Sequence, residues 1–144
     1  MEHVLVSACL LGVPCRYDGA SKPCPRLIAK LRRTAAVPIC PEQLGGLPTP
    51  RVRQYLVGGD GHAVLDGQAH VVNELGADVT DHFLRGAAEA VRLARLFDVH
   101  VAYLKSKSPS CGYGLVDIEG VWTAGDGVTT AGLLRRGIRI LRVD

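Results

Sequence analysis

The sequence has few aromatic residues, no long apolar run and no strong excess of charge of either sign. Aromatic residues make up 5% of the 144 residues, and the net charge is +3. No stretch approaches the roughly 20 consecutive apolar residues of a transmembrane helix. The small net charge does not by itself indicate a nucleic-acid-binding surface. The N-terminus lacks the basic and apolar regions of a signal peptide, so we expect a cytoplasmic protein without a membrane segment.

Closely spaced cysteine pairs are also missing. The chain has five cysteines, an odd number that cannot be fully paired. None of them forms the Cys-x-x-Cys pair of zinc ribbons and thioredoxins. In a reducing compartment, cysteines are more often metal ligands, catalytic groups or core residues than disulfides. Any metal site in this protein must therefore be assembled by the fold from distant positions.

Short apolar strands do alternate with amphipathic helices along the chain. The pattern predicts three helices: one begins near residues 23–25, one covers 80–97 and one covers 126–136. It predicts strands at 3–8, 36–39, 99–104 and 138–143. In the last strand, Arg139 and Arg142 alternate with apolar residues, which is typical of a strand at a sheet edge. Strands that alternate with helices predict a single α/β layered domain over residues 1–144, with a mainly parallel open sheet flanked by helices.

Turn residues predict two small hairpins outside this sheet. One covers residues 57–76, with strands at 62–65 and 69–72, and the other lies around 115–122. The tripeptide Gly-Asp-Gly occurs at 59–61 and again at 125–127. We interpret this recurrence of turn residues as chance.

Three cysteines follow predicted strands. Cys9 and Cys40 end the first two apolar runs, and Cys111 lies in the loop Ser108-Pro109-Ser110-Cys111-Gly112 after the third. The carboxyl ends of parallel strands share one edge of a sheet, which is where open α/β sheets bind their ligands. We therefore expect the three thiols to converge at this edge.

Three thiolates without an obvious fourth protein ligand suit an iron–sulfur cluster that leaves one iron open, and zinc is the main competitor. Each cysteine alone is more often a small buried hydrophobic residue. Cys15, on the same loop as Cys9, is either a fourth ligand or a neighbouring thiol without a ligand role. Cys24 lies between two prolines and is interpreted as incidental.

Other polar residues are expected near the same edge. Glu42 follows Cys40 by two residues and is the best candidate acid or base, although a solvated loop charge is the alternative. Ser108 and Ser110 either hydrogen-bond a cluster or substrate, or shape the proline turn. Further side chains either hold a small polar heterocycle or bridge the loops, and these are Arg16, Tyr17, Asp18 and Arg51.

Several motifs together resemble a bacterial family of small proteins that includes thiouracil desulfidase. They are Val6-Ser7-Ala8-Cys9-Leu10-Leu11-Gly12, Cys15-Arg16-Tyr17-Asp18-Gly19, Ile39-Cys40-Pro41-Glu42, Pro48-Thr49-Pro50-Arg51, Asp78-Val79-Thr80 and Ser108-Pro109-Ser110-Cys111-Gly112. The Cys-Pro-Glu and Ser-Pro-Ser-Cys-Gly elements are specific in combination, and the resemblance covers nearly the whole chain.

The resemblance implies a 4Fe–4S cluster that is held by Cys9, Cys40 and Cys111, with one open iron for the sulfur of a thiocarbonyl substrate. It places Glu42 and Ser108 at the reaction centre, and it argues against Cys15 as a ligand. The implied reaction is non-redox removal of sulfur from a thiolated heterocycle such as thiouracil, which gives the oxo product and hydrosulfide. The implied partner is this small-molecule base.

Two other classes of function remain open from the residues alone. One is a zinc-bound structural or hydrolytic module. The other is a non-enzymatic module that associates with a nucleotide or RNA through its basic loops. The sequence carries no strong nucleic-acid signal, and nothing in it indicates an oligomeric state.

Overall fold

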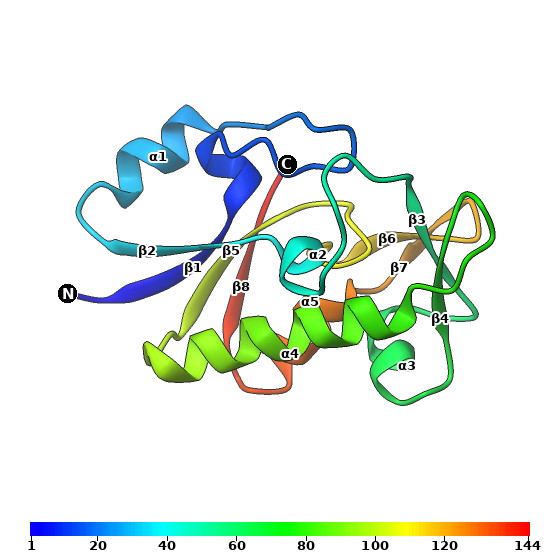
Figure 1. Ribbon diagram of the computed structural model, residues 1–144. Coiled ribbons are helices and arrows are strands. Elements are labelled where there is room, and N and C mark those ends of the chain that lie inside the picture. Colours follow the sequence, from blue (N-terminus) through cyan, green and yellow to red (C-terminus); the bar gives the residue numbers. More distant parts are fainter.

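Two sheets form the framework of the computed structural model, which describes residues 1–144 (Figure 1). Sheet A has four strands in the order β2-β1-β5-β8, all parallel. These strands are β1 (His3–Ser7), β2 (Ala35–Ile39), β5 (Val101–Lys105) and β8 (Arg139–Val143). Parallel neighbours require long crossover connections, and the helices of the chain supply them.

Helices cover both faces of sheet A. α1 (Pro25–Leu31) lies on one face, while α4 (Thr80–Leu96) and α5 (Val128–Leu134) lie on the other (Figure 1). The side chains of β1 alternate to match: Leu5 packs with α4 and α5, whereas the residues before and after it pack with α1. A strand that is buried on both faces reads as a continuous apolar run, which is the pattern of this segment.

Sheet B is mixed and lies beside sheet A (Figure 1). Its strand order is β4-β3-β6-β7. The strands are β3 (Gln54–Val57), β4 (His70–Asn73), β6 (Leu115–Ile118) and β7 (Val121–Ala124). The outer pairs are antiparallel, and the central pair, β3 with β6, is parallel. The two small excursions along the chain thus combine into a second sheet.

α4 joins the two sheets. Phe83 and Ala87, near its start, pack in the core of sheet B, whereas Ala90 and Ala94 pack in the core of sheet A. The helix therefore fixes the position of one sheet relative to the other. None of the helices has both the length and the apolar character that crossing a membrane requires.

The structure confirms the α/β class, the parallel main sheet with β8 at its edge, and the hairpin around 115–122. The strand predicted at 62–65 is wrong. This segment is a helix, α3 (Gly61–Leu65), because the Asp60 side chain accepts hydrogen bonds from the backbone N–H groups of His62 and Ala63. Such a cap satisfies N–H groups that a short helix leaves free, and β4 pairs with β3 instead.

The two Gly-Asp-Gly segments pack against each other, a contact that the sequence did not predict. The N–H of Gly61 donates to the carbonyl of Asp126 at 2.7 Å, and the N–H of Asp126 donates to the Asp60 carboxylate at 3.0 Å. A Cβ at Gly61 would overlap the backbone of Gly127. Glycine is required here because two backbones meet without room for side chains.

The packing of α2 (Pro41–Leu44) against α4 also depends on glycine, and it generates a test. A Cβ at Gly86 would overlap the carbonyl oxygen of Pro41. We expect Gly86→Ala to lower the free energy of unfolding by about 1–3 kcal/mol, the usual cost of overpacking. Chemical denaturation of the cluster-free protein measures this change.

Gly132→Ala in α5 is the matched control for this test. A Cβ at Gly132 would meet Val91 Cγ2 at 3.4 Å, an ordinary contact. We expect this variant to gain about 0.5–1 kcal/mol of stability, because alanine is the better helix former. Equal stability changes in Gly86→Ala and Gly132→Ala would contradict the packing described for α2 and α4.

Candidate functional site

The three strand-end thiols meet in one pocket, as the strand pattern predicts. Cys9 lies in a short 3-10 turn, η1 (Ala8–Leu11), directly after β1, and Cys40 is the N-cap residue of α2 after β2. Cys111 lies in the loop that follows β5. All three line a pocket of about 320 Å³ between the carboxyl edge of sheet A and the strands of sheet B. This volume is within the range of small-molecule sites.

The spacing of the sulfurs separates two kinds of metal site. No three cysteine sulfurs lie within 4.8 Å of one another. A single tetrahedral zinc ion with Zn–S bonds of about 2.3 Å needs sulfurs roughly 4 Å apart. An iron–sulfur cluster is larger and spreads its ligands further. The arrangement therefore fits a cluster better than a single ion.

Cys15 lies beside the strand-end thiols. The residue is 2% exposed, and its thiol is near enough to those of Cys9 and Cys40 to shift the pKa of each. Its carbonyl oxygen accepts from the Cys40 thiol at 3.6 Å and from the Arg51 guanidinium at 3.1 Å. Cys24 caps the start of α1 and does not line the pocket. The pocket thus contains four thiols.

The four pocket thiols differ in acidity. The hydrogen bond from Cys15 lowers the pKa of Cys9, despite the burial of that thiol. The contact between Cys15 and Cys40 raises the pKa of Cys40, and burial and the nearby Glu42 carboxylate act in the same direction. Burial, and then Glu42, raises the pKa of Cys111 to about 12. Because only thiolates bind metal, a bound metal must replace the protons of Cys40 and Cys111.

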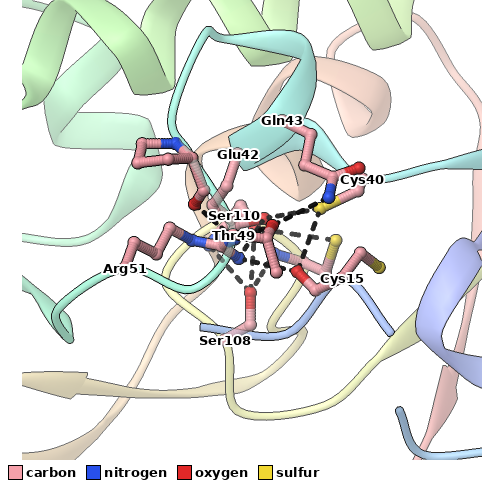
Figure 2. A network of polar contacts seen from close by, with 10 residues as sticks. Cys15, Cys40, Glu42, Gln43, Thr49, Arg51, Ser108 and Ser110 are labelled. Carbon is pink, nitrogen blue, oxygen red and sulfur yellow. Dashed lines mark hydrogen bonds and ion pairs between the residues drawn. The ribbon is translucent and has the colours of Figure 1, made fainter. Parts of the chain in front are cut away.

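Glu42 is a buried carboxylate on the wall of this pocket. Its side chain is 10% exposed, and Oε1 accepts a hydrogen bond from the Ser110 hydroxyl at 2.7 Å. Oε2 lies 3.7 Å from the Cys40 sulfur and 3.9 Å from the Arg51 guanidinium. Figure 2 shows these side chains directed toward one another. The alternative of a solvated loop charge does not hold, because the carboxylate is buried and hydrogen-bonded. A carboxylate in this position is a candidate base.

Ser108 also lines the pocket, and its loop fixes its position. Its Oγ accepts from the backbone N–H groups of Ser110, at 3.1 Å, and Cys111, at 2.9 Å. A Cβ at Gly112 would come within 2.6 Å of the Ser108 carbonyl oxygen, so the tight loop requires glycine there. The Ser108 and Ser110 hydroxyls lie 2.9 Å apart.

Arg51 bridges loops and lines the pocket at once. Its guanidinium donates to the carbonyls of Cys15 and Pro48 and to the Thr49 hydroxyl. The side chain is 6% exposed. It therefore holds the Cys15 loop next to Glu42, which is the bridging alternative that the sequence left open.

Of the other residues proposed from the sequence, some line the pocket and some do not. Arg16 and Tyr17 line the pocket, but Asp18 and Ser110 do not. The Asp18 carboxylate accepts from the N–H of Ala20 at 3.0 Å and so stabilises its own turn.

Sequence reasoning missed the wall that sheet B contributes. It consists of Arg53, Gln54, Tyr55, Asp117 and Trp122. Lys105 and Lys107 also line the pocket, and burial, followed by repulsion from Arg16, lowers the pKa of Lys105. Neither lysine has a carboxylate within ion-pair distance. The only available signal was the cationic and aromatic character of residues 53–55 and 105–107, which does not show that they share a pocket.

Comparison with known proteins gives three findings. The family described as 2-thiouracil desulfurase matches residues 4–144. The chain is 38% identical over 141 residues to the uncharacterized protein YbbK of Bacillus subtilis (strain 168), covering 96% of this chain and 93% of that protein. It is 44% identical to a solved structure, the 4Fe–4S-dependent thiouracil desulfidase TudS, with a TM-score of 0.83 over 99% of this chain and 91% of that one.

The differences in thiol acidity can be measured by alkylation. In cluster-free protein, we expect the alkylation rate of Cys9 to level off below about pH 9, because its pKa is lowered from 9.0. The rate at Cys111 should keep rising towards pH 12, because its thiol stays protonated until its pKa of about 12. Mass spectrometry of the two peptides over a pH series checks this. The shapes of the two curves are compared, since burial alters absolute rates, and coincident midpoints would contradict the assignment.

Proposed function

Because the chain belongs to the 2-thiouracil desulfurase family and is an enzyme of the desulfidase type, we propose that it removes sulfur from a thiolated heterocycle such as thiouracil. The products are the oxo heterocycle and hydrosulfide. Replacement of a C=S bond by C=O leaves the oxidation state of carbon unchanged, so the reaction needs no electron donor or acceptor. The observation that carries this proposal is the meeting of three strand-end thiols and a buried carboxylate in one pocket.

The residues present fit a 4Fe–4S cluster. Cys9, Cys40 and Cys111 would hold it, since they come from three adjacent parallel strands and their sulfurs are too dispersed for one ion. When bound, a cluster with one iron free of protein ligands supplies a soft Lewis acid that takes up the sulfur of the substrate and polarises its carbon. The solved relative TudS is described as 4Fe–4S-dependent, which supports this assignment.

The protein itself supplies the proton chemistry. Glu42 is the base: it takes a proton from a water molecule, which attacks the thiocarbonyl carbon. Burial and its fixed partners keep the carboxylate aimed at the pocket instead of at bulk solvent. Ser108, at the pocket surface, positions the substrate or returns a proton to it.

The charged lining suits an electron-rich substrate and an anionic product. Arg16, Lys105 and Lys107 face the pocket without carboxylate partners. In a partly enclosed site, such cations stabilise the negative charge that develops as sulfur leaves as hydrosulfide. The aromatic ring of Tyr17 provides a flat surface for a heterocycle.

Serine substitutions test the ligand set. We expect Cys9→Ser, Cys40→Ser and Cys111→Ser each to abolish cluster retention, because each removes one of three thiolates. Iron content and visible absorbance after anaerobic reconstitution measure this. Cys24→Ser is the control and should retain the cluster, as should Cys15→Ser. Loss of iron in Cys15→Ser together with retention in Cys40→Ser would show that the ligand set is wrong.

A single substitution also tests the base. Glu42→Gln keeps the shape and the hydrogen-bonding reach of the side chain but cannot take a proton. We expect the variant to retain the cluster while turnover of thiouracil falls roughly 100-fold or more. Anaerobic assays of hydrosulfide release and of the thiocarbonyl absorbance measure the rate. Undiminished turnover would remove Glu42 from the mechanism.

A further inference from the structure

The hydroxyl of Ser110 connects the two proton-transfer residues of the pocket. We propose that Ser110 is a positioning residue that relays a proton between Glu42 and Ser108, so that Ser108 donates a proton only after Glu42 has accepted one. This inference rests on the proposed desulfuration. It replaces the substrate contact that the sequence suggested for Ser110 with a role behind the pocket wall.

The geometry forms an unbroken chain of three side chains. Ser110 Oγ lies 2.7 Å from Glu42 Oε1 and 2.9 Å from Ser108 Oγ (Figure 2). Glu42 and Ser108 both line the pocket, whereas Ser110 does not line it and is 1% exposed. Both ends of the chain therefore reach the substrate, while its middle is shielded from bulk water.

Counting protons fixes the direction of the chain. A hydroxyl group has one proton to donate, and an ionised carboxylate has none. The Ser110 hydroxyl has two acceptors within reach, Glu42 Oε1 at 2.7 Å and the Cys111 sulfur at 3.7 Å, and the carboxylate is much the closer. With the Ser110 proton on Glu42, the contact between the two serines is donated by Ser108. While Glu42 is ionised, the hydroxyl proton of Ser108 thus points away from the substrate.

Protonation of Glu42 reverses this direction. The attacking water loses one O–H bond, and its proton goes to Glu42. Glu42 then passes a proton to the Ser110 oxygen, Ser110 passes its own to the Ser108 oxygen, and Ser108 gives its own to the substrate as the C–S bond breaks. One proton enters the chain and one leaves it, so all three residues return to their starting states. No electrons are exchanged.

The protein holds Ser110 rigidly enough for this role. Its carbonyl oxygen accepts from the N–H groups of Thr129 and Thr130 at the start of α5, at 2.9 and 3.1 Å. A Cβ at Gly127 would come within 2.5 Å of the Ser110 backbone, so the second Gly-Asp-Gly segment packs directly on this residue. Glu42 is fixed as well, and the relay removes any need for its carboxylate to move between the two sides of a substrate.

The first experiment compares Ser110→Ala with a control variant in the cluster-loaded enzyme. We expect Ser110→Ala to retain iron and KM while kcat for thiouracil falls about 100-fold, the usual scale for loss of an acid–base step. Thr130→Val removes another buried hydroxyl near Ser110, one that does not line the pocket and has no hydrogen-bond partner, and should stay close to wild type. Combining Ser110→Ala with Glu42→Gln should cost no more than Glu42→Gln alone, since the two act as one unit.

Solvent isotope effects distinguish a relay from a merely structural role. In mixtures of H2O and D2O, we expect single-turnover rates of the wild type to follow a curved dependence on the deuterium fraction, because several protons move together. In Ser110→Ala the dependence should be a straight line. Wild-type turnover in Ser110→Ala, or a curved dependence in both proteins, would overturn the relay while leaving the desulfidase function intact.

Infrared spectra of the cluster-free protein test the chain without turnover. The carboxylate band of Glu42, identified by its loss in Glu42→Gln, should shift in Ser110→Ala and stay in place in Thr130→Val. An unshifted band in Ser110→Ala would overturn the proposal even if the wild-type enzyme were inert towards thiouracil. Inert wild-type enzyme with a shifted band would instead refute the desulfuration of this substrate.

Discussion

The parallel pairing of β1 with β2 on one side and β5 on the other is the constraint on which the site depends. It brings three strand ends, and the thiols that follow them, to one edge of sheet A. The register is held by burial on both faces, because Leu5 packs under α4 and α5 while its neighbours pack under α1. A shift by one residue would exchange these faces and displace Cys9 from its partners.

The edge of sheet A alone would be exposed to solvent, and the rest of the fold encloses it to form a pocket. α4 ties the two sheets together, and glycine at position 86 lets α2 approach α4 closely enough to set Glu42 on the pocket wall. Sheet B closes the opposite side with Tyr55 and Trp122. The paired Gly-Asp-Gly segments link this sheet to the loop of Ser110.

Local features of the sequence predicted the parts of the site that depend on strand ends. Cys9, Cys40 and Cys111 each follow an apolar run, and Glu42 lies in the first turn of the short helix that Cys40 caps. Contacts between distant segments were not predictable in this way. Asp60 caps a helix, α3, where the sequence pattern predicted a strand. Nothing in the local sequence indicates that residues 59–61 pack on residues 125–127. The place of Ser110 behind the wall likewise follows from its contact with Glu42, 68 residues away in sequence.

The proposed chemistry depends on whether the pocket thiols hold an iron–sulfur cluster. The most direct measurement is the metal and acid-labile sulfide content of wild-type protein that has been purified and reconstituted anaerobically. We expect roughly four iron and four sulfide per chain, the content of a 4Fe–4S cluster, with broad visible absorption. One zinc per chain, with no sulfide and no visible absorption, would contradict it.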